Sequence, residues 1–353
     1  MPAENVSLTQ NLTATLQEYF SIHSPSQIGV LVDENTKPHC YPLVKEVLPD
    51  HLLIEIKSGE TNKNLTTCSQ IWEQMTHAHF DRKALLINLG GGVIGDMGGF
   101  CAATYKRGIP FINLPTTLLS QVDASVGGKL GIDFQGYKNH IGLFQEPDQV
   151  VVYSGFLQTL PHAELRSGFA EVIKHSLIQD AAYWPEVKRQ GLQVQDWSDH
   201  IAHSISIKSR VVNADFKEGG LRKVLNYGHT IGHAVESFYL ETDDYLLHGE
   251  AIAIGMIAEN YLSVKYCGLP QREAEEINQF LLDIYGYRSI ERHDEEAIVE
   301  LTLQDKKNEG GTVQASLLKS IGEATYDIPI TSSDVREGLS YYRYQKNKPH
   351  AEA

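Results

Sequence analysis

Short apolar runs alternate with helical patterns through the first half of the sequence. Between the runs, Asn64–His79 and Gly95–Tyr105 carry helical spacing. Five runs bounded by polar or Gly/Pro turns predict strands: Gln27–Val32, Leu52–Ile56, Ala84–Leu89, Phe111–Leu114 and Gln149–Tyr153. Strands that alternate with helices form a largely parallel sheet covered by helices. The pattern therefore predicts an α/β domain, expected over residues 1–157.

Strand signals become rare after about residue 157. Six segments predict amphipathic or buried helices: Leu165–Leu177, Trp197–Val212, Lys223–Tyr239, Glu250–Tyr266, Arg272–Tyr285 and Glu295–Leu303. Val313–Ser316 and Ala324–Ile328 have the character of short strands. We therefore expect a second, mostly α-helical domain over residues 158–353.

Charge and cysteine content narrow the class of protein. The formal net charge of −15 argues against general nucleic-acid binding, which needs a basic surface. The four cysteines form no C-x-x-C motif, which favours reduced thiols in a cytoplasmic protein. The first twenty residues have no apolar signal core, and no apolar run is long enough to span a bilayer. We expect no membrane partner.

A histidine-rich stretch in the second half suggests metal chemistry. In a helix, His229 and His233 would project from one face, and His248 follows soon after. These side chains can all bind a divalent metal ion, or some can bind the ion while another acts as a general acid or base. With 15 histidines in the chain, one such spacing can also arise by chance. Gly228 and Gly232 precede the histidines, where each glycine costs a helix roughly 1 kcal/mol; close approach of a ligand or another helix would explain them.

A glycine loop follows the predicted strand Ala84–Leu89. Gly90, Gly92 and Gly95 match G-x-G-x-x-G, in which backbone N–H groups approach a pyrophosphate at a helix N-terminus. The acidic residue that usually binds the ribose about 20 residues later is missing, because residues 97–122 contain no Asp or Glu. Nucleotide binding with a different ribose partner, or a purely structural glycine turn, both fit this loop.

Lysines beside glycine turns, in Val126–Lys129 and Gly136–His140, are suited to a phosphate or carboxylate. Glu171 and Lys174 are spaced as a surface ion pair on a helix. The apolar neighbours of Glu171 instead indicate burial, and a buried carboxylate needs a cation or a metal ion.

Seven ordered motifs, spread over roughly residues 30 to 325, resemble the 3-dehydroquinate synthase family. They are GGGVIGDMGGFCAATYKRG, LPTTLLSQVDASVGGKLGID, YKNHIG, SGFAEVIKH, GLRKVLNYGHTIGHAVE, HGEAIAIGM and DKKN…LLKSIGEA. The resemblance implies a Rossmann-like NAD-binding α/β domain followed by a mostly α-helical domain that holds one divalent metal ion, Zn or Co. It implies conversion of 3-deoxy-D-arabino-heptulosonate 7-phosphate to 3-dehydroquinate and phosphate, in the shikimate pathway of aromatic amino acid biosynthesis. The reaction passes through transient oxidation by NAD, phosphate elimination, reduction and intramolecular aldol closure.

The resemblance also assigns site residues. The metal ligands it implies are Glu171, His229 and His248, which makes His233 a phosphate-side residue and a proton-transfer candidate. Residues implied at the substrate are Lys129, Asn139, Asn226 and Lys306 for the phosphate, Lys208 and Arg222 for the carboxylate, Asp123 and Lys174 for the reacting hydroxyls, and Arg107 from the partner of a homodimer. Lys307 is an alternative to Lys306. Residues implied at NAD are Asp33, Glu60, Lys63, Gly90, Gly91, Gly92, Gly95, Asp96, Thr116, Thr117, Lys138, Phe156 and Thr159. Asp33, Glu60 or both then replace the missing ribose acid.

Three rival functions share parts of this pattern. Related cyclases act on other sugar phosphates, and we expect them to differ at positions such as Lys208, Asn226 and Lys306. A metal-dependent polyol dehydrogenase would share the glycine loop but not the VGGK and KNHIG runs. An NAD-binding regulatory protein would have lost a ligand or a lysine, and none is missing. The sequence departs from the family pattern at Pro110, at His140 and in the interval Leu240–Leu247. We expect these departures to affect local geometry and dimer contacts.

Overall fold

The apolar runs of the first half form one parallel sheet in the computed structural model, which describes residues 5–135, 137–240, 242–303 and 313–347. The sheet has the order β1-β8-β5-β4-β2-β3. Its strands are β1 (Val6–Leu8), β2 (Ile28–Asp33), β3 (Leu52–Ile56), β4 (Leu85–Gly90), β5 (Phe111–Pro115) and β8 (Gln149–Val152), and every neighbouring pair is parallel. The predicted α/β class and all five predicted strands are confirmed; β1 has no counterpart among them.

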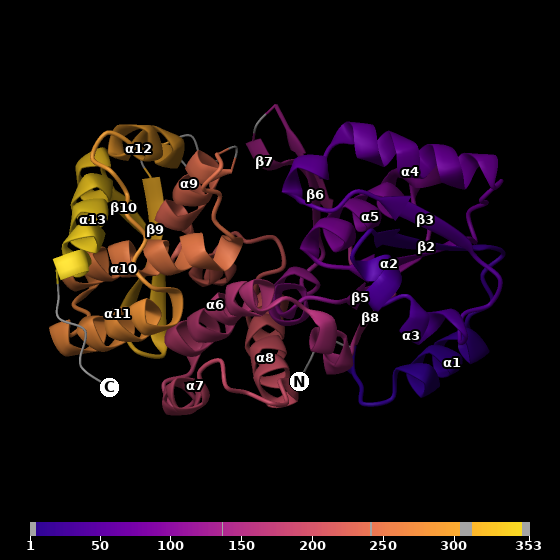
Figure 1. Cartoon of the computed structure of the whole chain (residues 1–353), viewed down its shortest axis with the longest axis horizontal. Coiled ribbons are helices and arrows are strands. Elements are labelled where there is room, and N and C mark those ends of the chain that lie inside the picture. Colours follow the sequence, from indigo (N-terminus) through magenta and orange to yellow (C-terminus); the bar gives the residue numbers. More distant parts are fainter. Residues whose placement is uncertain (1–4, 136, 241, 304–312, 348–353) are drawn as a thin grey trace. The chain divides into compact units, whose positions relative to one another are not determined.

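Helices cover both faces of this sheet (Figure 1). Helices α4 (Leu65–His77) and α5 (Gly92–Thr104) pack on one face, and α1 (Leu12–Ile22) and α3 (Pro42–Lys45) on the other. Within β2, Leu31 packs with α4 and α5 while Val30 and Val32 pack with α1 and α3, because successive strand side chains point to opposite faces. The short helices of this part are α2 (Thr36–His39), η1 (Glu60–Asn62), η2 (Tyr105–Arg107) and η4 (Ser154–Thr159).

Between β5 and β8 the chain forms structure that the sequence pattern did not predict. A π-helical turn, η3 (Ser120–Ala124), is followed by an antiparallel hairpin of β6 (Lys129–Phe134) and β7 (Tyr137–Phe144). Strand β7 has no buried face among its described residues, so it lacks the apolar alternation that identifies a strand.

Contacts divide the chain into two units, residues 1–165 with 196–213 and residues 166–195 with 214–353. The sequence analysis expected a single boundary after residue 157. Almost all of helix α8 (Ser198–Ala214), which carries Lys208, thus groups with the sheet.

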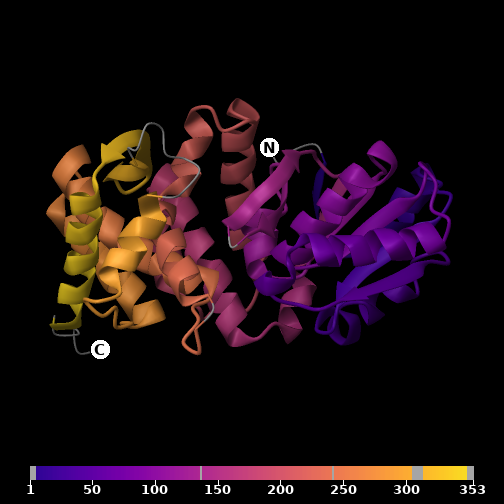
Figure 2. The same ribbon diagram turned by 90° about the horizontal axis from the view of Figure 1, so that it is seen from above.

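The second unit is built around α10 (His248–Cys267), whose middle is buried on all sides. Helix α10 packs against α9, α11, α13 and β9, and α13 is the C-terminal helix that is yellow in Figures 1 and 2. The elements around it are α6 (His162–Gln179), α7 (Trp184–Gln190), η5 (Leu221–Asn226), α9 (His229–Tyr239), α11 (Gln271–Tyr285), α12 (Glu295–Leu303), the hairpin β9 (Val313–Ser320) and β10 (Glu323–Ile330), α13 (Ser332–Tyr344) and η6 (Gln345–Asn347). The mostly helical character is confirmed.

The predicted continuous helix Lys223–Tyr239 is wrong, because the chain breaks it at Gly228. This glycine adopts φ +80°, a left-handed conformation that a helix interior excludes, so η5 ends at Asn226 and α9 begins at His229.

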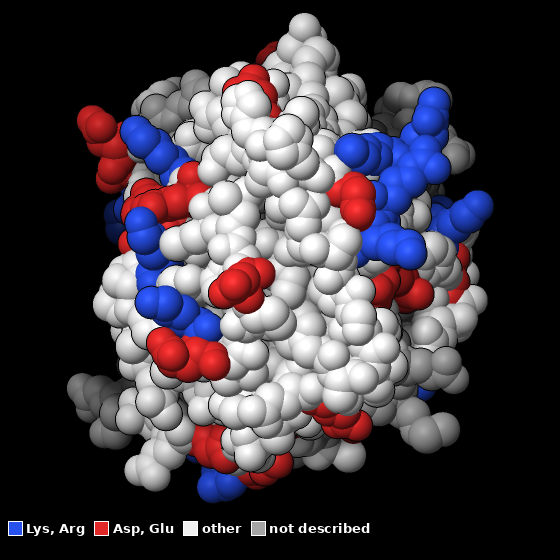
Figure 3. All heavy atoms as spheres, turned by 90° about the vertical axis from the view of Figure 1, so that its right-hand side faces the viewer, with Lys and Arg blue, Asp and Glu red and all other residues white. Residues whose placement is uncertain are grey.

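One face of the molecule (Figure 3) mixes charges of both signs despite the acidic composition. The face in Figure 3 carries Lys and Arg side chains interspersed with Asp and Glu on a mainly neutral surface. Within the described residues, none of the helices has the length and apolar character needed to cross a membrane.

Candidate metal centre and nucleotide site

Glu171, His229 and His248 meet in the second unit, each from a different helix. Oε1 of Glu171 lies 3.4 Å from Nε2 of His229 and 3.7 Å from Nε2 of His248. One ligand atom from each residue lies within 4.8 Å of the other two. Ligand atoms at the corners of a tetrahedral zinc site are about 3.3 Å apart, so a small contraction of this triangle would suit a divalent metal ion.

Two close backbone approaches bring these helices together. A Cβ on Gly249, the second residue of α10, would lie 2.0 Å from the carbonyl oxygen of Ser167 on α6. Glycine lets the start of α10 abut α6 one turn before Glu171, and Gly249 N–H donates to Ser167 Oγ at 2.9 Å. A Cβ on Gly255 would lie 2.0 Å from the carbonyl oxygen of Gly228, which brings α10 against the start of α9. A Cβ on Gly232 would lie 3.0 Å from the carbonyl oxygen of Ala251 on α10, so approach of another helix, one of the two explanations offered for Gly228 and Gly232, is present.

Hydrogen bonds orient both imidazole rings. His229 Nδ1 lies 3.1 Å from the carbonyl oxygen of Tyr227, and His248 Nδ1 lies 3.2 Å from Oε2 of Glu236. Both partners are acceptors, so each Nδ1 carries hydrogen when it bonds. Nε2 of each ring then lies on the side of Glu171, where it can bind a metal ion once it is deprotonated, an arrangement common among metal-binding histidines.

Glu171 and His229 of this cluster are buried, and His248 is partly exposed. Glu171 has no exposed surface and forms an ion pair with the buried ammonium of Lys174, so the surface ion-pair alternative is wrong. Burial lowers the pKa of His248, but the carboxylates of Glu236 and Glu171 outweigh it and raise that pKa to about 10. A metal ion would take the place of this proton, because metal ligation requires the deprotonated nitrogen.

Three further predicted residues, His233, Arg222 and Asn226, belong to the second unit. The ring of His233, one turn along α9, has its centroid 4.9 Å from that of His229. Arg222 is almost fully buried, and its Nη1 donates to the carbonyl oxygen of Phe216 at 2.6 Å. Asn226 donates from Nδ2 to Oε1 of Glu218 at 2.8 Å.

Glu218 was not singled out by the sequence analysis. Its positive φ of +60° is uncommon for a non-glycine residue and marks a constrained loop. Asp215 holds that loop by accepting N–H bonds from Gly219, Gly220 and Arg222. The acidic residues around two glycines, DFKEGG, are a signal that could have identified the loop.

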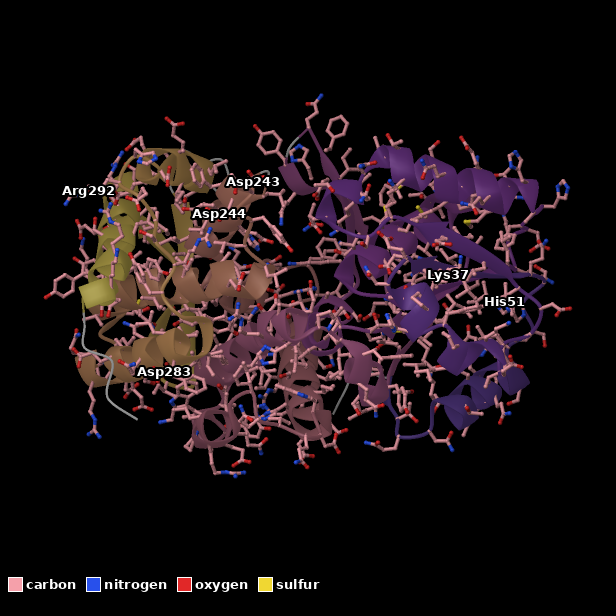
Figure 4. The ribbon with its side chains drawn as sticks, in the orientation of Figure 1. Lys37, His51, Asp243, Asp244, Asp283 and Arg292 are labelled. Carbon is pink, nitrogen blue, oxygen red and sulfur yellow. The ribbon has the colours of Figure 1, made fainter. Side chains whose placement is uncertain are left out.

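The interval between α9 and α10 is tied to the rest of the second unit. Asp244, labelled with Asp243 in Figure 4, accepts from Nη2 of Arg288 at 3.1 Å. Leu247 N–H donates to Oε2 of Glu250 at 3.0 Å. These bonds fix the chain that leads into His248.

In the first unit, the predicted NAD residues gather at the carboxyl ends of neighbouring strands. Strand β4 ends at Gly90, Gly91 caps α5, and the N–H of Thr116, after β5, donates to Gly90 O at 3.0 Å. The strand–turn–helix context that G-x-G-x-x-G requires is therefore present. Asp33 ends β2, the neighbour of β4 on its other side, and its Oδ1 accepts the N–H groups of Asn35 and Thr36.

Lys63 links predicted cofactor and substrate residues. Its buried Nζ lies 2.6 Å from both Oδ2 of Asp96 and Oδ1 of Asn139. Burial lowers the pKa of Lys63, yet Asp96 and Glu60 raise it above its ordinary value, so the ammonium stays charged. Asn139 has φ +49°, and its N–H donates to Oδ1 of Asp133 at 2.7 Å. Nζ of Lys138, the residue before Asn139, lies 3.9 Å from Oε1 of Glu60.

Lys208 meets Asp123 in the same unit. Nζ of Lys208 lies 2.8 Å from Oδ1 of Asp123, and it also donates to the carbonyl oxygen of that residue. Asp123 lies in the π-helical turn η3, a form that occurs often at functional sites. Lys129 begins β6 and is exposed.

The remaining predicted residues occupy varied places. Arg107 follows Lys106 in a loop where both have positive φ, +71° and +51°. Phe156 is buried in the core on the α1 and α3 face, which leaves only its backbone to contact a cofactor, and Thr159 ends η4. The side-chain hydroxyl groups of Thr117 and Ser120 form a hydrogen bond with each other. Lys306 and Lys307 lie outside the described residues.

Comparison with known proteins gives consistent matches along the chain. Residues 53–167 match the family described as 3-dehydroquinate synthase N-terminal, and residues 168–308 match the one described as 3-dehydroquinate synthase C-terminal. The 3-dehydroquinate synthase of Parabacteroides distasonis is 38% identical over 348 residues, which are 97% of this chain and 99% of that protein. That of Halorhodospira halophila is 44% identical over 280 residues, 77% of each chain.

Solved structures of similar fold include sugar phosphate cyclases and a dehydrogenase. A 2-epi-5-epi-valiolone synthase from Streptomyces hygroscopicus, solved with NAD+ and Zn2+, superposes with a TM-score of 0.86 at 22% identity over 98% of both chains. A 2-deoxy-scyllo-inosose synthase, complexed with carbaglucose-6-phosphate, NAD+ and Co2+, gives 0.83 at 22% identity over 96% of both chains. The NADH-dependent butanol dehydrogenase of Thermotoga maritima gives 0.68 at 16% identity over 97% of both chains. These likenesses establish the fold.

Proposed function

The chain belongs to the 3-dehydroquinate synthase family, and we propose that it converts 3-deoxy-D-arabino-heptulosonate 7-phosphate to 3-dehydroquinate and phosphate. The observation that carries this proposal is the cluster of Glu171, His229 and His248, with both histidine Nε2 atoms directed at one carboxylate oxygen. Curated relatives at 38% and 44% identity carry the synthase name, whereas the cyclases for other sugars match at 22%.

The donor set suits one divalent metal ion, Zn or Co. Two imidazoles and a carboxylate are the ligands of several catalytic zinc sites, in which a further position stays available to substrate. Tyr227 and Glu236 accept hydrogen bonds from Nδ1 of His229 and His248, as the outer partners of metal-binding histidines do in such sites. When bound, the metal ion supplies polarisation of a substrate oxygen.

NAD is proposed at the carboxyl ends of β2, β4 and β5. The backbone N–H groups at the start of α5 suit a pyrophosphate, and Gly91 gives it access. Strand β4 lies between β5, which follows it in the sequence, and β2, which precedes it and ends at Asp33, so Asp33 is proposed as the ribose acid in place of the missing downstream one. When bound, NAD supplies reversible hydride acceptance.

The proposed substrate groups have complementary charge. Lys63 holds Oδ1 of the Asn139 carboxamide, and the NH2 group of that amide is the proposed donor to phosphate. Lys129 adds positive charge at the start of β6 in the same hairpin. Arg222, which Phe216 O holds in the second unit, is proposed for the substrate carboxylate. Lys208, which Asp123 holds in the first unit, is proposed as a further cation for the anionic substrate.

Proton movement is proposed to involve residues near the metal cluster. Lys174 is held against Glu171, and His233 lies beside His229, so both can exchange protons with substrate hydroxyls. The substrate phosphate is itself a base and can accept the proton removed during its elimination.

We also propose a homodimer in the cytoplasm. The dimer is proposed from the family resemblance, which assigns Arg107 to the phosphate site of the partner subunit. The positive φ values of Lys106 and Arg107 mark this turn as strained. Support for a reducing compartment comes from the four cysteines, all of which are free.

Product identification tests the proposed reaction. The purified chain is incubated with NAD, Zn2+ and either the heptulosonate 7-phosphate or glucose 6-phosphate, the sugar that carbaglucose-6-phosphate imitates. We expect 3-dehydroquinate from the first and no cyclised product from the second, by NMR. A carbocycle from glucose 6-phosphate alone would contradict the proposal.

A further inference from the structure

A buried carboxylate on α10 has no part in the proposed chemistry. Glu259 has no exposed surface and lies in the middle of the second unit. A buried ionised carboxylate is costly unless it accepts hydrogen bonds. The groups that donate hydrogen bonds to its two oxygens therefore indicate which segment Glu259 stabilises.

Both oxygens of Glu259 accept backbone N–H groups at the start of α9. Gly228 N–H donates to Oε2 at 2.6 Å, and Ile231 N–H donates to Oε1 at 3.0 Å. Helix α9 has no side-chain cap of its own, since its N-cap is Gly228. The carboxylate of another helix thus satisfies N–H groups that would otherwise be unpaired at this N-terminus and complements its positive dipole.

The two bonds bracket His229, which lies between Gly228 and Ile231 in the sequence. The next residue of α10 acts on the other side of the same histidine. Tyr227 OH donates to Oδ1 of Asn260 at 2.6 Å, and the carbonyl oxygen of Tyr227 accepts from His229 Nδ1. Glu259 and Asn260 therefore hold both the backbone and the ring orientation of His229.

Helix α10 also begins with His248, so one helix fixes two of the three proposed ligands. Asn260 is itself anchored by a donation from its Nδ2 to Oδ1 of Asn278 on α11 at 2.8 Å. The close packing of Gly255 on Gly228 leaves α9 no room to shift towards α10.

From this arrangement we propose that Glu259 is a positioning residue of the metal centre, which fixes His229 at the start of α9 so that its Nε2 faces Glu171. The inference rests on the proposed function, because it assumes that His229 and His248 bind the metal ion. Glu259 touches neither metal nor substrate in this role, and its effect reaches the site through Gly228, Ile231 and the ring of His229.

Glu259→Gln is the direct test. The amide keeps the size of the side chain, but its NH2 group faces an N–H donor, so one of the two bonds is lost. Loss of an outer partner typically weakens metal affinity about 10-fold to 100-fold. Ser263→Ala is the matched control: Ser263 is fully buried one turn later on α10, and its hydroxyl bonds to the carbonyl oxygen of Glu259 and to the N–H of Leu318 on β9.

The measurement is Zn2+ affinity of the full-length, metal-stripped chain by competition with a chromophoric chelator. The visible spectrum of the Co2+ form reports the ligand geometry. NAD affinity and far-UV circular dichroism are measured on the same samples. We expect Glu259→Gln to weaken Zn2+ binding at least about 10-fold and to change the Co2+ spectrum. Ser263→Ala should do neither, and NAD affinity should stay within about twofold in both variants.

If Glu259→Gln does not fold, Tyr227→Phe tests the same support, because it removes only the hydroxyl bonded to Asn260. It should weaken Zn2+ binding about fivefold. Metal affinities of Glu259→Gln or Tyr227→Phe equal to that of Ser263→Ala would overturn the positioning role. If His248→Ala binds Zn2+ as tightly as the wild-type chain does, the proposed metal centre itself is wrong.

Discussion

Oδ1 of Asn139 lies 2.6 Å from Nζ of Lys63, although the two residues are 76 positions apart in the sequence. The same ammonium lies 2.6 Å from Asp96, in the first turns of α5 after the glycine loop. One buried lysine therefore fixes both the helix proposed to bind NAD and the amide proposed to bind phosphate.

Lys63→Met should weaken NAD and substrate binding together and lower the free energy of unfolding by about 3 kcal/mol, because it leaves the carboxylate of Asp96 without its buried partner. Denaturant unfolding and binding titrations check this. Lys37→Met is the control: Lys37, labelled in Figure 4, forms an exposed ion pair with Glu55, and its loss should cost at most about 0.5 kcal/mol. Equal costs for the two variants would refute the role of Lys63.

His248→Ala should remove the bound metal ion and lower turnover at least about 100-fold, because it deletes a ligand rather than an outer partner. Metal analysis of the purified chain and steady-state rates measure this. His51→Ala, in the first unit, is the matched histidine control and should leave both unchanged. Normal metal content in His248→Ala would show that His248 is not a ligand.

Arg222→Lys should raise KM for the heptulosonate about 10-fold or more with little change in NAD affinity, because a lysine keeps the charge but loses the two-pronged contact with a carboxylate. Arg292→Lys, on the exposed segment before α12, supplies the control. An unchanged KM in Arg222→Lys would remove this residue from the substrate site.

Asp33→Asn should weaken NAD binding about 10-fold, because a neutral amide accepts a ribose hydroxyl less strongly than a carboxylate does. The variant keeps an oxygen for the N–H groups of Asn35 and Thr36, so the fold should be preserved. Asp283→Asn, an exposed change in α11, is the control. If NAD affinity is unchanged in Asp33→Asn, the ribose acid lies elsewhere, with Glu60 the next candidate.

The parallel sheet was predictable because its strands are buried on both faces. Runs such as Leu85–Gly90 are apolar apart from Asn88 and end at glycine or polar turns, a local signal that needs no knowledge of neighbouring strands. The hairpin of β6 and β7 gave no such signal, since β7 has no apolar face. The break at Gly228 was also missed, because a glycine within a helical pattern is compatible with either a helix interior or a new start.

The metal cluster was partly predictable for a different reason. His229 and His248 lie in recognisable motifs, but their meeting with Glu171 depends on the contact of Gly249 with Ser167, a residue on another helix. The supports at Glu236 and Glu259 are separated along the chain from the residues that they hold. No local pattern marks such partners, so only the folded structure identifies them.

The most direct test of the central claim is phosphate release from 3-deoxy-D-arabino-heptulosonate 7-phosphate by the purified chain with NAD, with and without a metal chelator. The account predicts that 3-dehydroquinate and phosphate form in equal amounts, that the chelator stops both, and that no NADH accumulates because the hydride is returned. A chain that binds NAD and metal yet releases no phosphate, or that accumulates NADH as a dehydrogenase would, contradicts the account.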